Sequence, residues 1–299
     1  RMKQVEERYI SLLTDFGFKR IFGTAMNKDL LICFLNSLFN GRQVVKDVSY
    51  LNPEHVGDVY TDRKAIFDVY CEGENGEKFI VEMQNAYQAY FKDRSLFYST
   101  FPIREQAPKG NDWDFKLNHV YTVALLNFNM NEDAFDKEKI RHHVQLCDTA
   151  THKIFYDKLE FIYVEIAKFN KTLEELETLY EKWLYALKNL YKLTQRPKEL
   201  CDKVFDRLFE EAEIAKFTPQ EMREYEASKM AYRDIKNSID TAKQEGLAEG
   251  MEKGMKKGME KGMNQKALDI ARNMLADSVD INLIMKYSGL TQEQIEKLK

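Results

Sequence analysis

The stretch AIFDVYCEGENGEKFIVEMQ, residues 65–84, reads as two buried β-strands that nevertheless contain two acids and an amide. These three side chains are Asp68, Glu82 and Gln84. A carboxylate without a partner is costly to bury, so a core strand normally avoids one. If the two acids lie side by side they repel each other, and a divalent cation bound by both removes that conflict. Oxygen ligands of this kind suit Mg²⁺ or Mn²⁺, which can assist the hydrolysis of a phosphodiester.

The turn between the two strands decides whether the acids share one face of a sheet. A two-residue loop of Asn75 and Gly76 would place Asp68 opposite Met83 and mix apolar with polar residues on both faces. A three-residue loop that starts one residue earlier, with Gly76 in the left-handed conformation, instead pairs Asp68 with Glu82. Since a one-residue slip reverses every side chain of a strand, the register that sorts the residues more cleanly is favoured. We therefore expect the three-residue loop.

In this register the two faces of the hairpin differ in character. One face is apolar and carries Phe67, Val69, Phe79, Val81 and Met83. The other face carries Ile66, Asp68, Tyr70, Ile80, Glu82 and Gln84. The β-carbons of the two acids are then expected about 5 Å apart, with the amide one pleat farther along the same face. The alternative is that both acids are solvent-facing residues of a half-exposed sheet.

The elements around this hairpin follow from the spacing of the apolar residues. Helical spacing indicates helices within 8–40, within 86–107 and from 172 onward, whereas β-branched and aromatic runs predict strands within 44–84, 119–128 and 159–169. Helices and strands in this order are typical of a mixed α/β domain. Because Pro197 interrupts the pattern, we expect one domain at 1–195 and a helical C-terminal region at 196–299.

Composition limits the classes of protein to which this chain can belong. It has 299 residues, of which 44% are hydrophobic and 31% charged, and this suits a soluble globular protein with a sizeable core. The net charge of −4 argues against a uniformly basic surface for nucleic acid but allows a local basic groove. No apolar stretch approaches the roughly 18 residues of a membrane helix, and the first residues lack the apolar core of a signal peptide. The four cysteines form no CxxC pair, so we expect reduced thiols in a cytoplasmic protein without membrane contact.

Glycine recurs every four residues in EGLAEGMEKGMKKGMEKG, at positions 246, 250, 254, 258 and 262. Each glycine costs a helix about 1 kcal/mol relative to alanine, so the segment 246–262 is marginal as an isolated helix. Glycine at this spacing also lets a second helix approach closely, and the neighbouring methionines offer an adaptable apolar edge. A partly helical, mobile linker is favoured over an oligomerisation helix.

The last segment, QKALDIARNMLADSVDINLIMKYSGLTQEQIEKLK, is predicted to form three short helices. Asp280 can cap the second helix and Gly289 can end it, while Thr291 with Gln294 forms a capping box for the third. A helix–turn–helix reader of DNA would look similar. Its basic residues are sparse, however, so a plain helical tail is favoured over a DNA reader.

Three motifs together resemble a known nuclease family. The hairpin FDVYCEGENGEKFIVEMQ resembles the PD-(D/E)xK nuclease core, with Phe67-Asp68 in place of Pro-Asp and Glu82-Met83-Gln84 in place of D/E-x-K. Together with TDFGFKRIFG near the start and FKDRSLFYST after the strands, residues 8–195 are similar to the recombination-promoting nuclease (Rpn) family, often described as transposases. This resemblance implies an α/β fold with the αβββαβ core of restriction-endonuclease-like proteins, and DNA that is cut with Mg²⁺.

The resemblance also implies roles for individual residues. Asp68 and Glu82 match the metal-binding acids, and Gln84 completes the catalytic set at a position that is usually lysine in the wider superfamily. Glutamine cannot supply the positive charge of lysine, but it could orient the attacking water or a phosphate oxygen. Lys19 and Arg94 fall in the flanking motifs and are assigned to phosphate contact in DNA binding. The alternative for these two is that they are ordinary surface or helix-end charges.

The sequence therefore predicts a Mg²⁺-dependent DNA endonuclease associated with transposition or recombination. The competing hypothesis is a DNA- or partner-binding protein that keeps the fold with weakened catalysis. Cutting of both strands would favour a homodimer.

Two further sets of residues can be considered for the site. Asp15 is either a further acid near the metal or a residue that starts a helix. No common zinc-ligand spacing fits His142, His143, Cys147 and His152, which are expected on a surface helix or loop.

Overall fold

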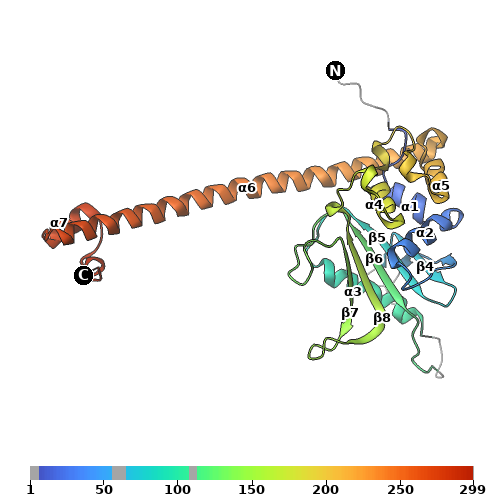
Figure 1. Cartoon of the computed structure of the whole chain (residues 1–299), viewed down its shortest axis with the longest axis horizontal. Helices are drawn as coiled ribbons and strands as arrows, with labels where there is room; N and C mark the ends of the chain where they lie inside the picture. Colours follow the sequence, from blue (N-terminus) through green and yellow to red (C-terminus); the bar gives the residue numbers. More distant parts are fainter. Residues whose placement is uncertain (1–6, 56–64, 108–112, 299) are drawn as a thin grey trace, which may run out of the picture. The chain divides into compact units, whose positions relative to one another are not determined.

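The computed structural model in Figure 1 describes residues 7–55, 65–107 and 113–298. The contacts of the chain divide it into two compact units, 1–236 and 237–299. The sequence analysis placed the boundary after residue 195, whereas helix α5 (Lys203–Ala212) packs into the main apolar core of the first unit. Tyr225, near the start of helix α6 (Pro219–Ala276), is buried in the same core.

A six-stranded mixed sheet forms the centre of the first unit, with the strand order β1-β4-β5-β6-β8-β7. Its strands are β1 (Val48–Tyr50), β4 (Val69–Gly73), β5 (Lys78–Gln84), β6 (Val120–Leu126), β7 (Arg141–Cys147) and β8 (Ile154–Glu165). Strands β5, β6 and β8 run parallel, whereas the pairs β1–β4, β4–β5 and β7–β8 are antiparallel. Two further short strands, β2 (Glu54–His55) and β3 (Ala65–Ile66), pair only with each other.

Helices cover both faces of this sheet (Figure 1). One face packs against α1 (Asp15–Phe22), α2 (Lys28–Phe39), α4 (Leu179–Asn189) and α5, and the main apolar core lies between them. Helix α3 (Phe91–Glu105) packs on the other face through smaller apolar clusters. The chain order α2, β1, β4, β5, α3, β6 therefore confirms the mixed α/β fold and the expected αβββαβ order.

The face predicted for Phe67 is wrong. Strand β3 ends at Ile66 and β4 begins at Val69, so the alternation of faces does not continue through the two residues between them. Phe67 instead packs with Tyr70 and Ile80, on the side of the sheet that α3 covers. A break in the strand at this point could not be read from the alternation alone.

Strand β7 corrects a second expectation, because the segment with His142, His143 and Cys147 is neither a helix nor a loop. It pairs with β8 at the edge of the sheet, and only His152 lies in the turn between the two strands, with φ +56°. An edge strand that keeps one side in solvent can carry many polar residues, so its sequence signal is weak. Strand β8 begins five residues earlier than predicted for the same reason, since its first residues are exposed.

The second unit contains most of α6 together with α7 (Ile281–Ser288) and α8 (Gln292–Glu296). Helix α6 continues through the glycine repeat 246–262, and space is open around each of these glycines. The end of α6 packs against α7 and α8 through a small core of Ala271, Ile284 and Ile295. Among the described residues, no helix combines the length and the apolar character needed to cross a bilayer.

The predicted caps of the C-terminal helices are confirmed. The Asp280 side chain accepts a hydrogen bond from the backbone N–H of Asn282 at the start of α7. Gly289 ends that helix with φ +73°. Thr291 and Gln294 form the expected capping box of α8. These signals depend on a few neighbouring residues, so the sequence alone was sufficient to locate them.

Candidate active site

The β4–β5 hairpin has the predicted register. Val69 faces Val81, and the residues of the two strands pair outward from a three-residue loop. Gly76 in that loop has φ +83°, the left-handed conformation that favours glycine. Asp68 directly precedes the first paired residue of β4, so its backbone lies at the level of Glu82.

Asp68 lies where the chain joins the sheet, and its carboxylate bonds to the backbone of the neighbouring strand. Its Oδ2 accepts a hydrogen bond of 2.9 Å from the Met83 N–H, and its Oδ1 lies 3.9 Å from Lys19 Nζ. Burial raises the pKa of Asp68, although the Met83 N–H and the positive charge of Lys19 act in the opposite direction. The Asp68 carboxylate is therefore held in place without being fully neutralised.

Glu82 is the most unusual acid of the molecule because it is buried beside another acid. Only 6% of its surface is exposed, and the face that carries it is covered by α3. Burial, reinforced by the negative charge of Asp68, raises the pKa of Glu82 to about 8. In the described part of the chain no lysine or arginine forms an ion pair with it. The alternative of a solvent-facing acid on a half-exposed sheet is therefore wrong for Glu82.

Gln84 connects Glu82 to helix α3. Its Nε2 donates a hydrogen bond of 3.2 Å to Glu82 Oε2, and its Oε1 accepts one of 2.6 Å from Arg94 Nη2. The other terminal nitrogen of Arg94 bonds to Gln88 Oε1. Because both ends of the Gln84 amide have partners, its orientation is fixed, and Arg94 brings its positive charge to the edge of the acidic pair.

Lys19 approaches the same acids from the opposite layer. It lies on α1, whose first turn is capped by the Thr14 hydroxyl, and its Nζ forms an ion pair of 2.7 Å with Asp15. The same Nζ is 3.9 Å from Asp68 Oδ1. The structure therefore places the five residues predicted for the site in two linked groups, Lys19 with Asp68 and Gln84 with Glu82 and Arg94. The two groups meet at β5, where Asp68 bonds to the backbone N–H of Met83, and Asp15 is attached to the first group through Lys19.

Tyr98 belongs to this site although the sequence analysis did not single it out. It follows Arg94 by one turn of α3, and the Arg94 guanidinium carbon lies 5.9 Å from the centre of its ring. Its ring also meets Phe67 edge to face at 5.5 Å. Burial, reinforced by the negative charge of Glu82, raises the pKa of its hydroxyl. The spacing of four residues from Arg94 was the signal that could have found it.

Comparison with family models decides the affiliation of the chain. Residues 12–242 match the model described as PD-(D/E)XK nuclease family transposase. This chain belongs to that family. Residues 264–299 match a second model, the C-terminal HTH domain of the Rpn/YhgA-like nuclease family. The searches of curated proteins and of solved structures each gave no match.

The second match bears on the tail of this PD-(D/E)XK family member. Helices α7 and α8 lie within the matched segment, which also includes the end of α6. The sequence analysis favoured a plain helical tail over a helix–turn–helix, and the family match favours the helix–turn–helix. The resemblance to the Rpn family is confirmed by both matches.

Members of the PD-(D/E)XK family typically use a divalent metal ion, and the acidic pair fits one. The described residues contain no group of three or more histidines, cysteines or acids that could form a metal cage. Two carboxylates are nevertheless what Mg²⁺ commonly takes from a protein, with water and substrate oxygens as its other ligands. Burial and the negative charge of Asp68 raise the pKa of Glu82 more than the positive charge of Arg94 lowers it, and a bound divalent ion would favour the ionised carboxylate.

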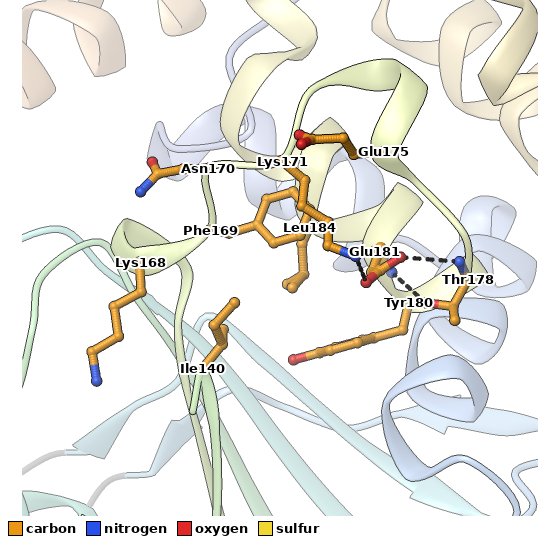
Figure 2. Close-up of a pocket in the computed structure, with 10 residues that line it drawn as sticks. All are labelled: Ile140, Lys168, Phe169, Asn170, Lys171, Glu175, Thr178, Tyr180, Glu181 and Leu184. Atoms are coloured by element: carbon orange, nitrogen blue, oxygen red, sulfur yellow. Dashed lines mark hydrogen bonds and ion pairs between the residues drawn. The ribbon is translucent and has the colours of Figure 1, made fainter. Parts of the chain in front are cut away.

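A separate pocket of about 410 Å³ lies between the end of β8 and α4 (Figure 2). Its charged groups are already paired, since Lys171 lies 2.5 Å from Glu181 Oε1 and the other oxygen of Glu181 accepts the Thr178 N–H. None of the residues predicted for the site lines it. We therefore propose that the chemistry belongs to the acidic pair of Asp68, just before β4, and Glu82 on β5, rather than to this pocket.

Proposed function

We propose that this chain is a Mg²⁺-dependent DNA endonuclease that hydrolyses phosphodiester bonds during transposition or recombination, with Mn²⁺ as an alternative ion. The observation that carries this proposal is the placement of Asp68 at the level of the buried Glu82, with Gln84 bonded to Glu82 and no ion pair to Glu82 among the described residues. Membership of a nuclease family supports the reaction class.

Each residue of the set has a distinct task in this proposal. Asp68 and Glu82 would hold the metal ion, which when bound would lower the pKa of a water molecule and neutralise charge on the phosphate. Gln84, oriented by Arg94, would hydrogen-bond to the attacking water or to a phosphate oxygen. Lys19 would contact a neighbouring phosphate from the opposite layer.

DNA would be bound mainly through its phosphates. The chain has a net charge of −4, so attraction depends on cations gathered locally, such as Lys19 and Arg94, rather than on the whole surface. A helix–turn–helix unit would add a second DNA contact. We place this activity in the cytoplasm, in line with the four free cysteines, and expect a homodimer if both strands are cut.

One observation favours a second candidate, a DNA- or partner-binding protein with weakened catalysis. Gln84 occupies the position where the PD-(D/E)XK motif has lysine, and an amide carries no positive charge. Arg94 reaches that amide from α3 and brings a guanidinium to the position. We therefore rank the endonuclease above the catalytically weakened protein.

The test is cleavage of supercoiled plasmid by the full chain in Mg²⁺, in Mn²⁺ or in EDTA. Wild-type protein and Glu174→Gln, a change at an exposed acid remote in sequence from the site, are expected to nick or linearise the plasmid when the metal is present. Asp68→Ala is expected to lose the activity. Plasmid that stays intact with the wild-type protein, while gel-shift assays show DNA binding, would replace the endonuclease by the second candidate.

A further inference from the structure

Two tyrosines stand exposed directly beyond Gln84, in the segment that connects β5 to α3. Tyr90 is 79% exposed and Tyr87 is 55% exposed. A single exposed aromatic side chain is unremarkable, but two in one short segment next to the proposed site indicate a binding surface. Both tyrosines also belong to a segment that is held firmly to the acidic pair.

Tyr90 is tied to the site through the backbone of α3. It precedes the first residue of the helix, and its carbonyl accepts a hydrogen bond of 2.9 Å from the N–H of Arg94. The same Arg94 contacts Gln84 through its side chain. Tyr90 has φ +65°, a left-handed conformation that is strained for an aromatic residue. Strain of this kind concentrates where a side chain must be presented for function.

Tyr87 is supported from behind by another ring. It meets Phe128 edge to face at 5.6 Å, and Phe128 packs in turn against Phe91 at 6.1 Å. Phe128 follows the end of β6, where the Asn127 N–H bonds to the carbonyl of Gln84. Tyr87 is therefore fixed at the same end of the sheet as the acidic pair, while more than half of its surface remains exposed to solvent.

Rings and cations in this arrangement match the chemistry of a DNA strand with unpaired bases. Arg94 and Lys19 offer positive charge for phosphates, and the two exposed phenol rings lie in the segment between Gln84 and α3. Within an intact duplex the flat faces of the bases are stacked on one another, so they cannot cover the tyrosines. Proteins that hold single strands combine a charged path for the backbone with aromatic rings for the bases.

We propose that Tyr87 and Tyr90 stack on unpaired bases next to the phosphodiester bond, so that the preferred substrate is single-stranded or locally unpaired DNA. This inference rests on the proposed function and names its substrate class. The tyrosines bind and position the strand, and they take no part in the bond cleavage itself.

The experiment measures binding of fluorescent oligonucleotides to the full chain in EDTA, so that no cleavage is needed for the readout. Three probes of equal length are compared: a single strand, a duplex, and a duplex with a central unpaired segment. Tyr87→Ala and Tyr90→Ala are each expected to bind the two unpaired probes about 5- to 100-fold more weakly, which corresponds to loss of one base stack. Tyr90→Phe keeps the ring and is expected to bind as the wild-type protein does.

Phe155→Ala is the matched control, since Phe155 is 82% exposed and lies at the start of β8, at the opposite end of the sheet. It should leave all three affinities unchanged. Unchanged binding of unpaired probes by both alanine variants, equal loss with Tyr90→Phe, or no preference of the wild-type protein for unpaired over duplex probes would overturn the inference. A failure of plasmid cleavage with the stacking effects intact would refute the nuclease alone, so the two failures are distinguishable.

Discussion

Two buried glutamates in the same sheet have pKa values that are shifted in opposite directions. Glu82 lies on β5 and Glu165 ends β8. Both lie at the carboxyl ends of their strands, on the same end of the sheet, because β5, β6 and β8 are parallel and in register there. Their exposed fractions are 6% and 1%. Burial alone would raise the pKa of both carboxyls. The pKa of Glu82 rises to about 8, whereas that of Glu165 falls below its ordinary value.

The difference comes from the partners that each glutamate receives. Glu165 Oε2 lies 2.5 Å from Lys168 Nζ and 2.8 Å from His142 Nε2, while Oε1 accepts the Met130 N–H at 2.6 Å. These partners outweigh the burial of Glu165 and hold its pKa low. Glu82 has a second carboxylate as its neighbour and one amide as its donor, and the positive charge of Arg94 offsets its burial only in part.

This fold can therefore neutralise a buried acid in its own sheet, and it does so at β8. At β5 it supplies no comparable ion pair among the described residues, so the pKa of Glu82 rises to about 8 and the metal-free protein holds this acid protonated at neutral pH. A buried acid with a strongly raised pKa next to a second acid is a candidate for a functional site, and on this ground we propose that role for Glu82. The proposed roles of the two glutamates, catalysis for Glu82 and stability for Glu165, can be tested by isosteric changes at each.

The largest effect is expected for Glu82→Gln on catalysis. The change keeps the shape of the side chain but removes the charge that would bind the metal, so plasmid cleavage in Mg²⁺ should fall about 1000-fold, or about 4 kcal/mol in the barrier. Initial rates of nicking on supercoiled plasmid provide the measurement. Cleavage within about tenfold of the wild-type rate would mean that Glu82 does not hold the ion.

Glu165→Gln should have the opposite profile, with little effect on cleavage per folded molecule and a large effect on stability. The change removes the charge that pairs with Lys168 and His142, and breaking a buried ion pair typically costs about 3 kcal/mol. Urea denaturation at pH 7 should show this loss, with Glu174→Gln as a control. A stable Glu165→Gln protein would show that the pairing is not what makes this glutamate different.

Local signals in the sequence were sufficient to predict the register of the β4–β5 hairpin. The Gly76 turn and the alternation along β5 specified the register that sets Asp68 beside Glu82, because a turn and a pleat involve only neighbouring residues. The burial of Glu82 could not be predicted in the same way. It depends on α3 lying across that face, which is a contact between distant parts of the chain.

Contacts between distant parts of the chain also explain which site residues the sequence patterns could not predict by themselves. Lys19 and Arg94 entered the predicted site through a family resemblance, because no local pattern says that two helices in opposite layers meet at one strand end. The partners of Glu165 were missed because β7, which carries His142, is a polar edge strand with little hydrophobic signal. Sequence patterns thus predicted elements and registers, and the electrostatics followed only from the packing.

The stability of the metal-free protein should depend on pH through Glu82. The folded state holds its proton up to a pKa of about 8, whereas the unfolded state releases it near 4.5. Between these values the folded state binds more protons at Glu82, so the contribution of this residue to stability is fully present below about pH 4.5 and is lost as pH rises toward 8. Glu82→Gln removes this loss and should be more stable than wild type by roughly 4 kcal/mol at pH 8.

Denaturation in EDTA at pH 5 and pH 8, for the wild-type protein and Glu82→Gln, provides the measurement. The gain of the variant should shrink at pH 5, and added Mg²⁺ should reduce the gain at pH 8 because the ion stabilises the charged acid only in the wild-type protein. A gain that is equal at both pH values would assign it to packing instead of to ionisation.

The smallest effect is expected for Lys19→Ala on DNA binding. Lys19 is shared between Asp15 and Asp68 in the free protein, so only part of its charge is available to a phosphate. Loss of one exposed contact should weaken duplex binding in EDTA about two- to fivefold. If Lys19 does contact a phosphate, the slope of log affinity against log salt should also become shallower by about 1.

Lys198→Ala, at an exposed lysine outside the site, is the control and should change neither the affinity nor the slope. An unchanged slope with a weakened affinity would instead mean that Lys19 acts by positioning Asp68, which would move it from the DNA-binding surface to the support of the acidic pair.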